Sequence, residues 1–148
     1  MQDENVLDIL KEYFSKCEYI DNLKIDYLSE GKAWSLEQKG TPVQLKKSVL
    51  GNRKMQLSFT LATRIFVNSI TDENQSKILG TFNDISEWMY QQTRKHNLPS
   101  LNDGEMAESL EATSNAFLFA VNKDRTEARY EMPCKFIYTK EGKINGRE

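Results

Sequence analysis

The chain has 148 residues, of which 39% are hydrophobic and 28% charged, a composition typical of one folded domain with its own core. Its formal net charge of −2 gives no footing for nucleic-acid binding through bulk charge, although it leaves room for a local basic patch. No apolar segment approaches the roughly 18 residues that a membrane helix needs. The N-terminus is acidic and polar, unlike a secretory signal, so we expect a protein made and used in a cytosol.

The first predicted element is an amphipathic helix from Asp3 to about Cys17. Asp3 is the predicted N-cap, because a side-chain oxygen at that position accepts a hydrogen bond from an otherwise unpaired backbone N–H group. The apolar side chains recur at the three- and four-residue spacing that forms one helical stripe, and they are Val6, Ile9, Leu10, Tyr13, Phe14 and Cys17.

Residues 22–38 are predicted to form a β-hairpin. Apolar and polar side chains alternate on both sides of residues 29–32, and Gly31 suits a turn there. Within residues 40–52, Pro42 and Gly51 bracket residues 43–50, and this segment fits either a short strand or an extended loop.

Residues 53–68 alternate for longer and predict a long strand. One face of this strand is more apolar than the other, and we expect it to turn toward the helices. That face carries Met55, Leu57, Phe59, Leu61, Thr63, Ile65 and Val67.

Residues 72–97 carry the second predicted helix, which begins either at residue 72 or near Thr81, because Gly80 and Thr81 are poor helix formers. Its end is well marked, since basic residues favour the negative end of the helix dipole and Pro99 follows shortly after. Residues 98–108 are predicted to be a polar loop. The stripe of this helix consists of Ile78, Leu79, Phe82, Ile85, Trp88 and Met89.

Two alternating runs of about 12 residues each follow, and they predict a long final hairpin. The polar tip of this hairpin is the sequence NKDR at 122–125. Pro133 lies within the second run and predicts that this strand is at a sheet edge or contains a bulge, because proline has no N–H group to donate. Residues 141–148 lack apolar periodicity and are predicted to be a flexible C-terminal tail.

These elements predict an α+β fold in a single domain, residues 1–140. The strands are separated too briefly for repeated crossover helices, so we expect a largely antiparallel sheet of about four to six strands with two helices packed on one face. The other face is then free for partners.

The residues needed for common catalytic and metal sites are missing. There is no glycine-rich phosphate loop, no paired-cysteine motif and no zinc-protease or serine-hydrolase motif. The two cysteines, Cys17 and Cys134, lie at apolar-facing positions and are expected to be buried free thiols. The only histidine, His96, is expected to be a solvated residue at a helix end. The sequence therefore predicts a protein that is not an enzyme and that needs no cofactor or metal.

One cluster of charge stands out as a candidate partner interface, namely Lys46, Lys47, Arg53 and Lys54. Such a cluster is most often a solvated surface. Its functional interpretation is a contact with an acidic partner surface or with DNA that passes nearby.

The order of segments resembles a family of phage proteins. The matching segments are VLDILKEYF, NLKIDYLSEGKAWSLEQ, MQLSFTLATRIFV, ISEWMYQQTRKHNLPSL and FLFAVNKDRTEARYEMPCKFIYTKE. They are similar to the small minor-capsid or tail-terminator proteins of long-tailed, siphovirus-like phages and prophages of Gram-positive bacteria. The resemblance covers about residues 3–140, and the stretch WMYQQTRKHNLPSL with the final hairpin is its most specific part.

The resemblance implies an α+β subunit that assembles as a ring, usually a hexamer, on the tail tube. The ring stops tube growth and presents the surface that docks the head connector, so the expected location is the head–tail junction of the virion, with assembly in the host cytoplasm. DNA would pass through such a ring without sequence-specific binding. The resemblance carries no diagnostic residue motif, no catalysis and no cofactor.

Two other functions stay open. The first is another joining protein of the virion, such as a head-completion or stopper protein. The second, from a different class, is a small-ligand-binding domain with a pocket between helices and sheet; its predicted lining is Trp34, Phe59, Phe82 and Trp88.

Overall fold

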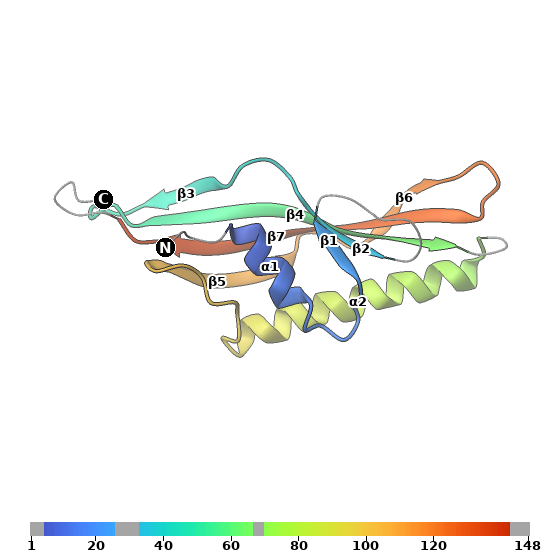
Figure 1. Cartoon of the computed structure of the whole chain (residues 1–148), viewed down its shortest axis with the longest axis horizontal. Coiled ribbons are helices and arrows are strands. Elements are labelled where there is room, and N and C mark those ends of the chain that lie inside the picture. The colour runs from blue at the N-terminus through green and yellow to red at the C-terminus, as the bar shows by residue number, and fades with distance from the viewer. Residues whose placement is uncertain (1–4, 26–32, 67–69, 143–148) are drawn as a thin grey trace.

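The computed structural model of the protein describes residues 5–25, 33–66 and 70–142. The fold is α+β, as predicted, with two helices on one face of a mostly antiparallel sheet (Figure 1). The sheet has seven strands rather than four to six. The elements are α1 (Val6–Phe14), β1 (Leu23–Ile25), β2 (Trp34–Gln38), β3 (Val43–Lys47), β4 (Arg53–Phe66), α2 (Asp72–Arg94), β5 (Glu105–Ala112), β6 (Phe117–Val121) and β7 (Glu127–Lys140).

A ribbon of two long strands forms the spine of the sheet. β4 and β7 pair antiparallel from Arg53 opposite Lys140 to Phe66 opposite Glu127, with no shift in register over 14 residues of each strand. At about 3.4 Å per residue the spine is about 45 Å long. β2 and β3 pair with the free side of β4, while β5 and β6 pair with the free side of β7. The ribbon therefore has a separate pair of edges at each end.

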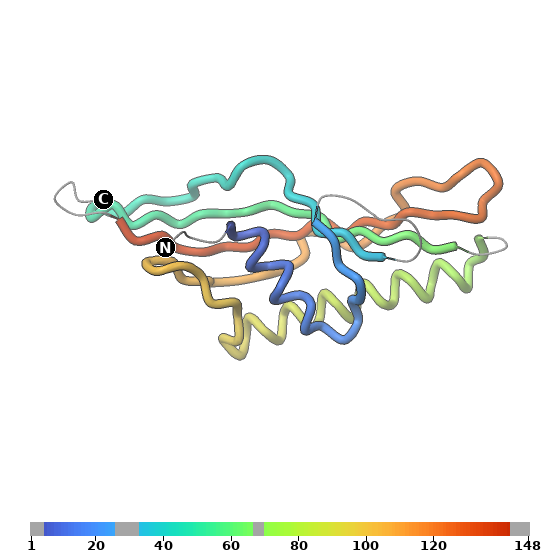
Figure 2. Tube along the Cα trace, in the orientation of Figure 1, coloured from blue at the N-terminus to red at the C-terminus, as the bar shows by residue number. Residues whose placement is uncertain are grey.

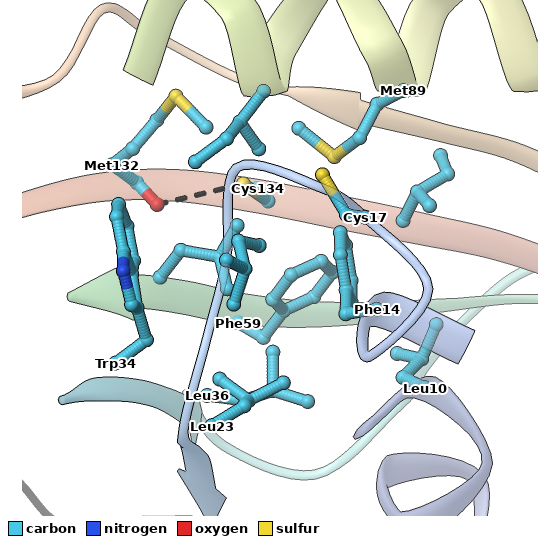
Figure 3. Packing of buried hydrophobic residues seen from close by; sticks show 14 of the residues in the cluster. Leu10, Phe14, Cys17, Leu23, Trp34, Leu36, Phe59, Met89, Met132 and Cys134 are labelled. Carbon is cyan, nitrogen blue, oxygen red and sulfur yellow. Dashed lines mark hydrogen bonds between the residues drawn. The ribbon is translucent and has the colours of Figure 1, made fainter. Parts of the chain in front are cut away.

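The core lies between this spine and the helices. Phe14 of α1 stands beside Phe59 of β4 and Trp88 of α2, with ring centroids 5.9 Å and 5.8 Å away. Figure 3 shows Phe14 and Phe59 among the aliphatic and sulfur side chains that fill this layer. The hydroxyl group of Tyr13 donates to the Asn97 carbonyl at 2.7 Å, which fastens α1 to the end of α2. The helix-facing residues predicted for residues 53–68 are confirmed at Leu57, Phe59 and Leu61, which are all buried.

The first helix is shorter than predicted. Its N-cap is Asn5, whose side-chain oxygen accepts from the Leu7 N–H group at 2.8 Å, whereas Asp3 lies outside the described residues. After Phe14 the chain tightens into three-residue turns, because the Cys17 N–H group bonds the Phe14 carbonyl. Cys17 is thus buried beyond the helix rather than within it.

The predicted hairpin at residues 22–38 is wrong, because β1 and β2 run parallel. Leu23 lies opposite Trp34, and the Trp34 N–H group donates to the Asn22 carbonyl, so both strands start at the same level. The predicted turn at residues 29–32 lies outside the described residues. Alternation identifies a strand but not its direction, and parallel pairing places both buried side chains, Leu23 and Trp34, against the helices.

The second helix starts at the earlier of its two predicted positions. Thr71 is the N-cap, and its hydroxyl oxygen accepts from the Asn74 N–H group at 3.1 Å. Capping at this end compensates for the weak propensity of Gly80, which lies mid-helix. The helix ends at Arg94, and His96 takes a positive φ of 56°, exposed to solvent.

The first strand of the final hairpin is broken in two. β5 starts at Glu105, inside the predicted loop, and pairs with one half of β7, whereas β6 pairs with the other half. Pro133 explains the break. In an antiparallel strand the N–H and C=O groups of a residue point to the same neighbour, and the Pro133 carbonyl accepts from Thr113, between β5 and β6. This strand was predicted to lie at a sheet edge or to contain a bulge. The edge position is wrong, because β7 pairs with β4 on one side and with β5 and β6 on the other, and the register shifts fall in β5 and β6 rather than in β7. The proline faces the gap between β5 and β6, where its missing N–H group interrupts neither ladder.

The predicted tail at residues 141–148 is attached at its beginning. The Glu141 N–H group donates to the Gly104 carbonyl at 2.6 Å, and the Gly142 N–H group donates to Asn52 Oδ1 at 2.8 Å. The remainder of that tail, residues 143–148, lies outside the described residues.

Candidate functional site

The structure brings all four predicted site residues together in two successive cross-strand pairs. Lys46 of β3 lies opposite Lys54 of β4, and Lys47 lies opposite Arg53. Because neighbouring pairs point to opposite faces of the sheet, each face carries one pair of like charges. Like charges directly opposite one another destabilise a sheet, so the fold itself gains nothing from this arrangement. We call Lys46, Lys47, Arg53 and Lys54 the basic cluster.

The basic cluster is poorly neutralised by the rest of the molecule. Lys54 pairs with Glu108 at 3.3 Å, but both side chains are exposed and such pairs contribute little. Within the described ranges, the other three cations form no ion pair. Residues 38–71 contain six of the 20 Lys and Arg residues and none of the 22 Asp and Glu residues, which leaves 14 cations and 22 anions, a net −8, elsewhere. The chain is therefore a strongly basic segment on an acidic body.

A tight turn, residues 48–52, links the two strands of the basic cluster. The Ser48 N–H group donates to the Asn52 carbonyl at 2.8 Å, and the Gly51 N–H group donates to the Ser48 carbonyl at 3.0 Å. Gly51 has φ +92°, which favours glycine. At the apex Val49 is fully exposed and Leu50 is 68% exposed. The turn thus holds two aliphatic side chains in solvent beside four cations.

Gly142 supports this turn from the far end of the chain, a contact that sequence reasoning missed. A Cβ atom at Gly142 would lie 2.5 Å from the Gly51 carbonyl carbon and 2.7 Å from the Leu50 oxygen. Figure 2 shows the turn beside the end of β7, at the opposite end of the ribbon from the β6–β7 turn. The only signal in the sequence was the glycine itself, placed just after a long strand.

Replacing Gly142 with alanine is expected to displace this turn, because the added methyl group collides with backbone atoms that cannot rotate away. Loss of the Asn52 hydrogen bond would lower the free energy of unfolding by about 1 kcal/mol. Hydrogen exchange of the Gly51 amide should accelerate. Gly80→Ala is the control, since a Cβ atom there meets nothing within 4 Å, and it should stabilise α2 by about 0.5–1 kcal/mol. Unchanged exchange in Gly142→Ala would contradict the supporting role.

A second unusual surface lies at the other end of the ribbon. All five residues of β6 are exposed, although four of them are large and apolar. The sequence predicted a strand of the final hairpin here but not its exposure; the signal for that exposure was the uninterrupted apolar run FLFAV, which a strand with one solvated face does not need. We call this strand the apolar edge, and its exposed large side chains are Phe117, Leu118, Phe119 and Val121.

A network of charges lies beside the apolar edge, on the sheet face without helices. Arg129 donates to Glu37 at 2.7 Å and to Glu131 at 2.8 Å, and its guanidinium group stands 5.6 Å from the ring centroid of Phe119. Burial acts to raise the pKa of Glu37, but hydrogen bonds from Arg129 and Ser35 outweigh it and hold that pKa below its ordinary value. These charges are satisfied within the chain, so they stabilise the ribbon rather than attract a partner.

The four residues predicted to line a ligand pocket pack in the core. Trp34, Phe59 and Phe82 are at most 3% exposed, and the rings of Trp34 and Phe82 lie 5.1 Å apart. Four hollows at the surface of the described residues are open to solvent and lined by other residues. One of about 340 Å³ lies between the end of β4 and α2, beside Phe66 and Lys77.

The described residues contain no group of three or more His, Cys, Asp or Glu side chains that could hold a metal ion. Cys17 and Cys134 are buried free thiols, as predicted, and burial raises the pKa of both. No helix in the described ranges is long and apolar enough to span a membrane. No family model matches this chain, and no curated protein matches it either.

Proposed function

We propose that this chain is a phage tail terminator, a virion protein that closes as a homo-oligomeric ring, usually a hexamer in the family it resembles, on the end of the tail tube. The ring stops tube growth and joins the tube to the head connector. DNA passes through the ring without sequence-specific binding. The protein would act at the head–tail junction after assembly in the host cytoplasm. It would do so as a structural subunit, without catalysis or a cofactor.

The like-charge pairing in the basic cluster is the observation that carries this proposal. Two pairs of opposed cations destabilise the sheet of the isolated molecule. An anionic partner surface that neutralises them in an assembly would remove this destabilisation. The exposed aliphatic apex at Val49 and Leu50 favours a protein surface over nucleic acid, because single-stranded nucleic acid is bound through aromatic stacking and duplexes through polar contacts. The tail tube rim is the partner that the proposed function provides.

The test exchanges the cluster's charge without harming the fold. In the double variant Lys46→Glu with Lys47→Glu, each glutamate lies opposite a cation of β4, so the hairpin should gain up to about 1 kcal/mol. Tubes assembled from tail-tube protein should be capped at fixed length by the wild-type protein and stay uncapped with this variant, as seen by negative-stain microscopy. A loss of capping in a more stable protein cannot be a folding defect.

Lys11→Glu with Lys16→Glu is the matched control, because both lysines are exposed on α1 and its C-terminal turn and the net charge changes equally. This control should cap tubes normally. Normal capping by the Lys46→Glu, Lys47→Glu variant would contradict a role of the basic cluster in binding the tube. If the wild-type protein leaves tube length uncontrolled but binds purified head connector, the chain is a head-completion protein instead.

A further inference from the structure

In the described part of the chain, the outer side of the apolar edge has no strand beside it. Among the described residues, β6 pairs with β7 alone. The Asn122 N–H group bonds the Glu127 carbonyl at 3.0 Å, so the neighbouring Val121 N–H group points away from β7. Natural edge strands are usually protected by charged side chains or proline. The apolar edge has neither a charge nor a proline, and the irregularity it has is a register shift against β7 between Leu118 and Ala120. Its composition is that of a segment which readily gains another strand.

Another open edge, of the same length as β6, belongs to β3 at the opposite end of the molecule. All five residues of β3 are exposed, and within the described ranges β3 pairs with β4 alone. β3 lies on the β4 side of the spine and β6 on the β7 side, as Figure 1 shows. The two edges are separated by much of the length of a rigid spine, so they cannot meet within one molecule. Between two molecules, however, β3 of one can extend the sheet beside β6 of the next.

The charges favour this unlike pairing over pairing of two β3 edges. Two β3 strands together would bring Lys46 and Lys47 of both molecules into contact, and like charges in neighbouring strands repel. β6 has no charge and offers aromatic faces, which attract cations. Rings at this end already engage arginines of their own chain, Phe66 with Arg64 at 5.7 Å and Phe119 with Arg129. The exposed face of Phe119 is left for a cation of another molecule.

We propose that a second copy of this chain docks its β3 edge against the apolar edge β6, so that one sheet continues from molecule to molecule. The contact joins two different surfaces, so repetition produces a ring or a filament rather than a closed pair. Val43 and Leu45 of β3 would cover the phenyl rings, while the turn at residues 48–52 stays free. This inference deepens the proposed function, on which its place in an assembly rests.

The test is disulfide capture between two variants that each carry one added cysteine, Leu45→Cys and Phe119→Cys. The native thiols do not interfere, since Cys17 and Cys134 are each 2% exposed. Under a mild oxidant, an equimolar mixture should give at least about tenfold more linked dimer than Phe119→Cys mixed with Val49→Cys. Docking raises the effective concentration of the first thiol pair only. Val49 is the control because it is the more exposed position.

A second variant tests whether formation of the linked dimer depends on the apolar edge. Phe117→Lys places a charge on β6 directly opposite Glu131 of its own chain, so the fold tolerates it, and in the Phe119→Cys background it should reduce linked dimer to the level of the control. Equal capture by Phe119→Cys alone would show pairing of two β6 edges and overturn the proposal. So would capture no greater than with Val49→Cys. If the wild-type protein caps tubes but no linked dimer is captured, only this inference is overturned. If the linked dimer is captured but tubes stay uncapped, only the terminator function is overturned.

Discussion

Replacing Phe59 with alanine is expected to lower the free energy of unfolding by about 3–5 kcal/mol, enough to unfold much of a protein of ordinary stability. Phe59 is 1% exposed at the centre of β4, with its ring centroid 5.9 Å from that of Phe14. Truncation removes that ring from the layer that joins the spine to α1. Because the spine is rigid and α1 is held at Tyr13, the cavity cannot close easily.

Urea denaturation monitored by circular dichroism measures this effect. Phe66→Ala is the matched control, because Phe66 ends the same strand but is 47% exposed, and it should cost less than about 1 kcal/mol. An equal loss in the two variants would mean that the helix-facing side of β4 is not the core of the molecule.

Replacing Arg129 with methionine is expected to cost about 2 kcal/mol at pH 7. The variant leaves Glu37 and Glu131 largely buried without their shared cation, which is strongly destabilising for a fully buried network. The side chains of Arg129, Glu37 and Glu131 are 22%, 15% and 10% exposed, so we expect less than the full penalty.

The cost should depend on pH in a defined direction. The pKa of Glu37 is lowered in the folded protein, so the stabilisation is complete above the pKa of the unfolded chain, about 4.5, and is lost as the pH falls through the folded value. The difference in unfolding free energy between wild type and Arg129→Met should therefore be largest at neutral pH and shrink below about pH 4.5. Urea titrations at pH 7 and pH 3 measure it.

Lys135→Met is the control for that series. Lys135 pairs with Glu111 at 3.5 Å on the same sheet face, but both side chains are substantially exposed, so its loss should cost less than about 1 kcal/mol. A pH-independent difference for Arg129→Met would mean that packing of the arginine, rather than its ion pairs, stabilises the ribbon.

Periodicity was sufficient to predict the long elements of this fold. β4, α2 and β7 each repeat their apolar pattern many times, so the helical and extended assignments of these segments were unambiguous. The short segments depended on information that lies elsewhere in the chain. Nothing between residues 22 and 38 encodes whether β2 runs with β1 or against it, because that direction depends on which neighbours cover Leu23 and Trp34.

The candidate site was predictable in part. The four cations of the basic cluster are close in sequence, so their grouping was visible, but their opposition in pairs depends on the register of β3 with β4, which includes a shift between Gln44 and Lys46. The support from Gly142 joins positions about 90 residues apart, and local patterns carry no trace of it. The strand at the apolar edge was predicted, but its exposure was not, because exposure depends on how far the helices extend.

The unshifted register of the spine makes the mechanical resistance of the molecule depend on the direction of the applied force. The turn at residues 48–52 continues into one end of β4, and the β6–β7 turn continues into the opposite end of β7. Tension applied between those two turns pulls the strands past each other along their length. Antiparallel hydrogen bonds lie perpendicular to that pull, so the whole ladder is loaded in shear at once instead of opening one bond after another. The protein should therefore resist stretching along its long axis far better than peeling of β6 from β7.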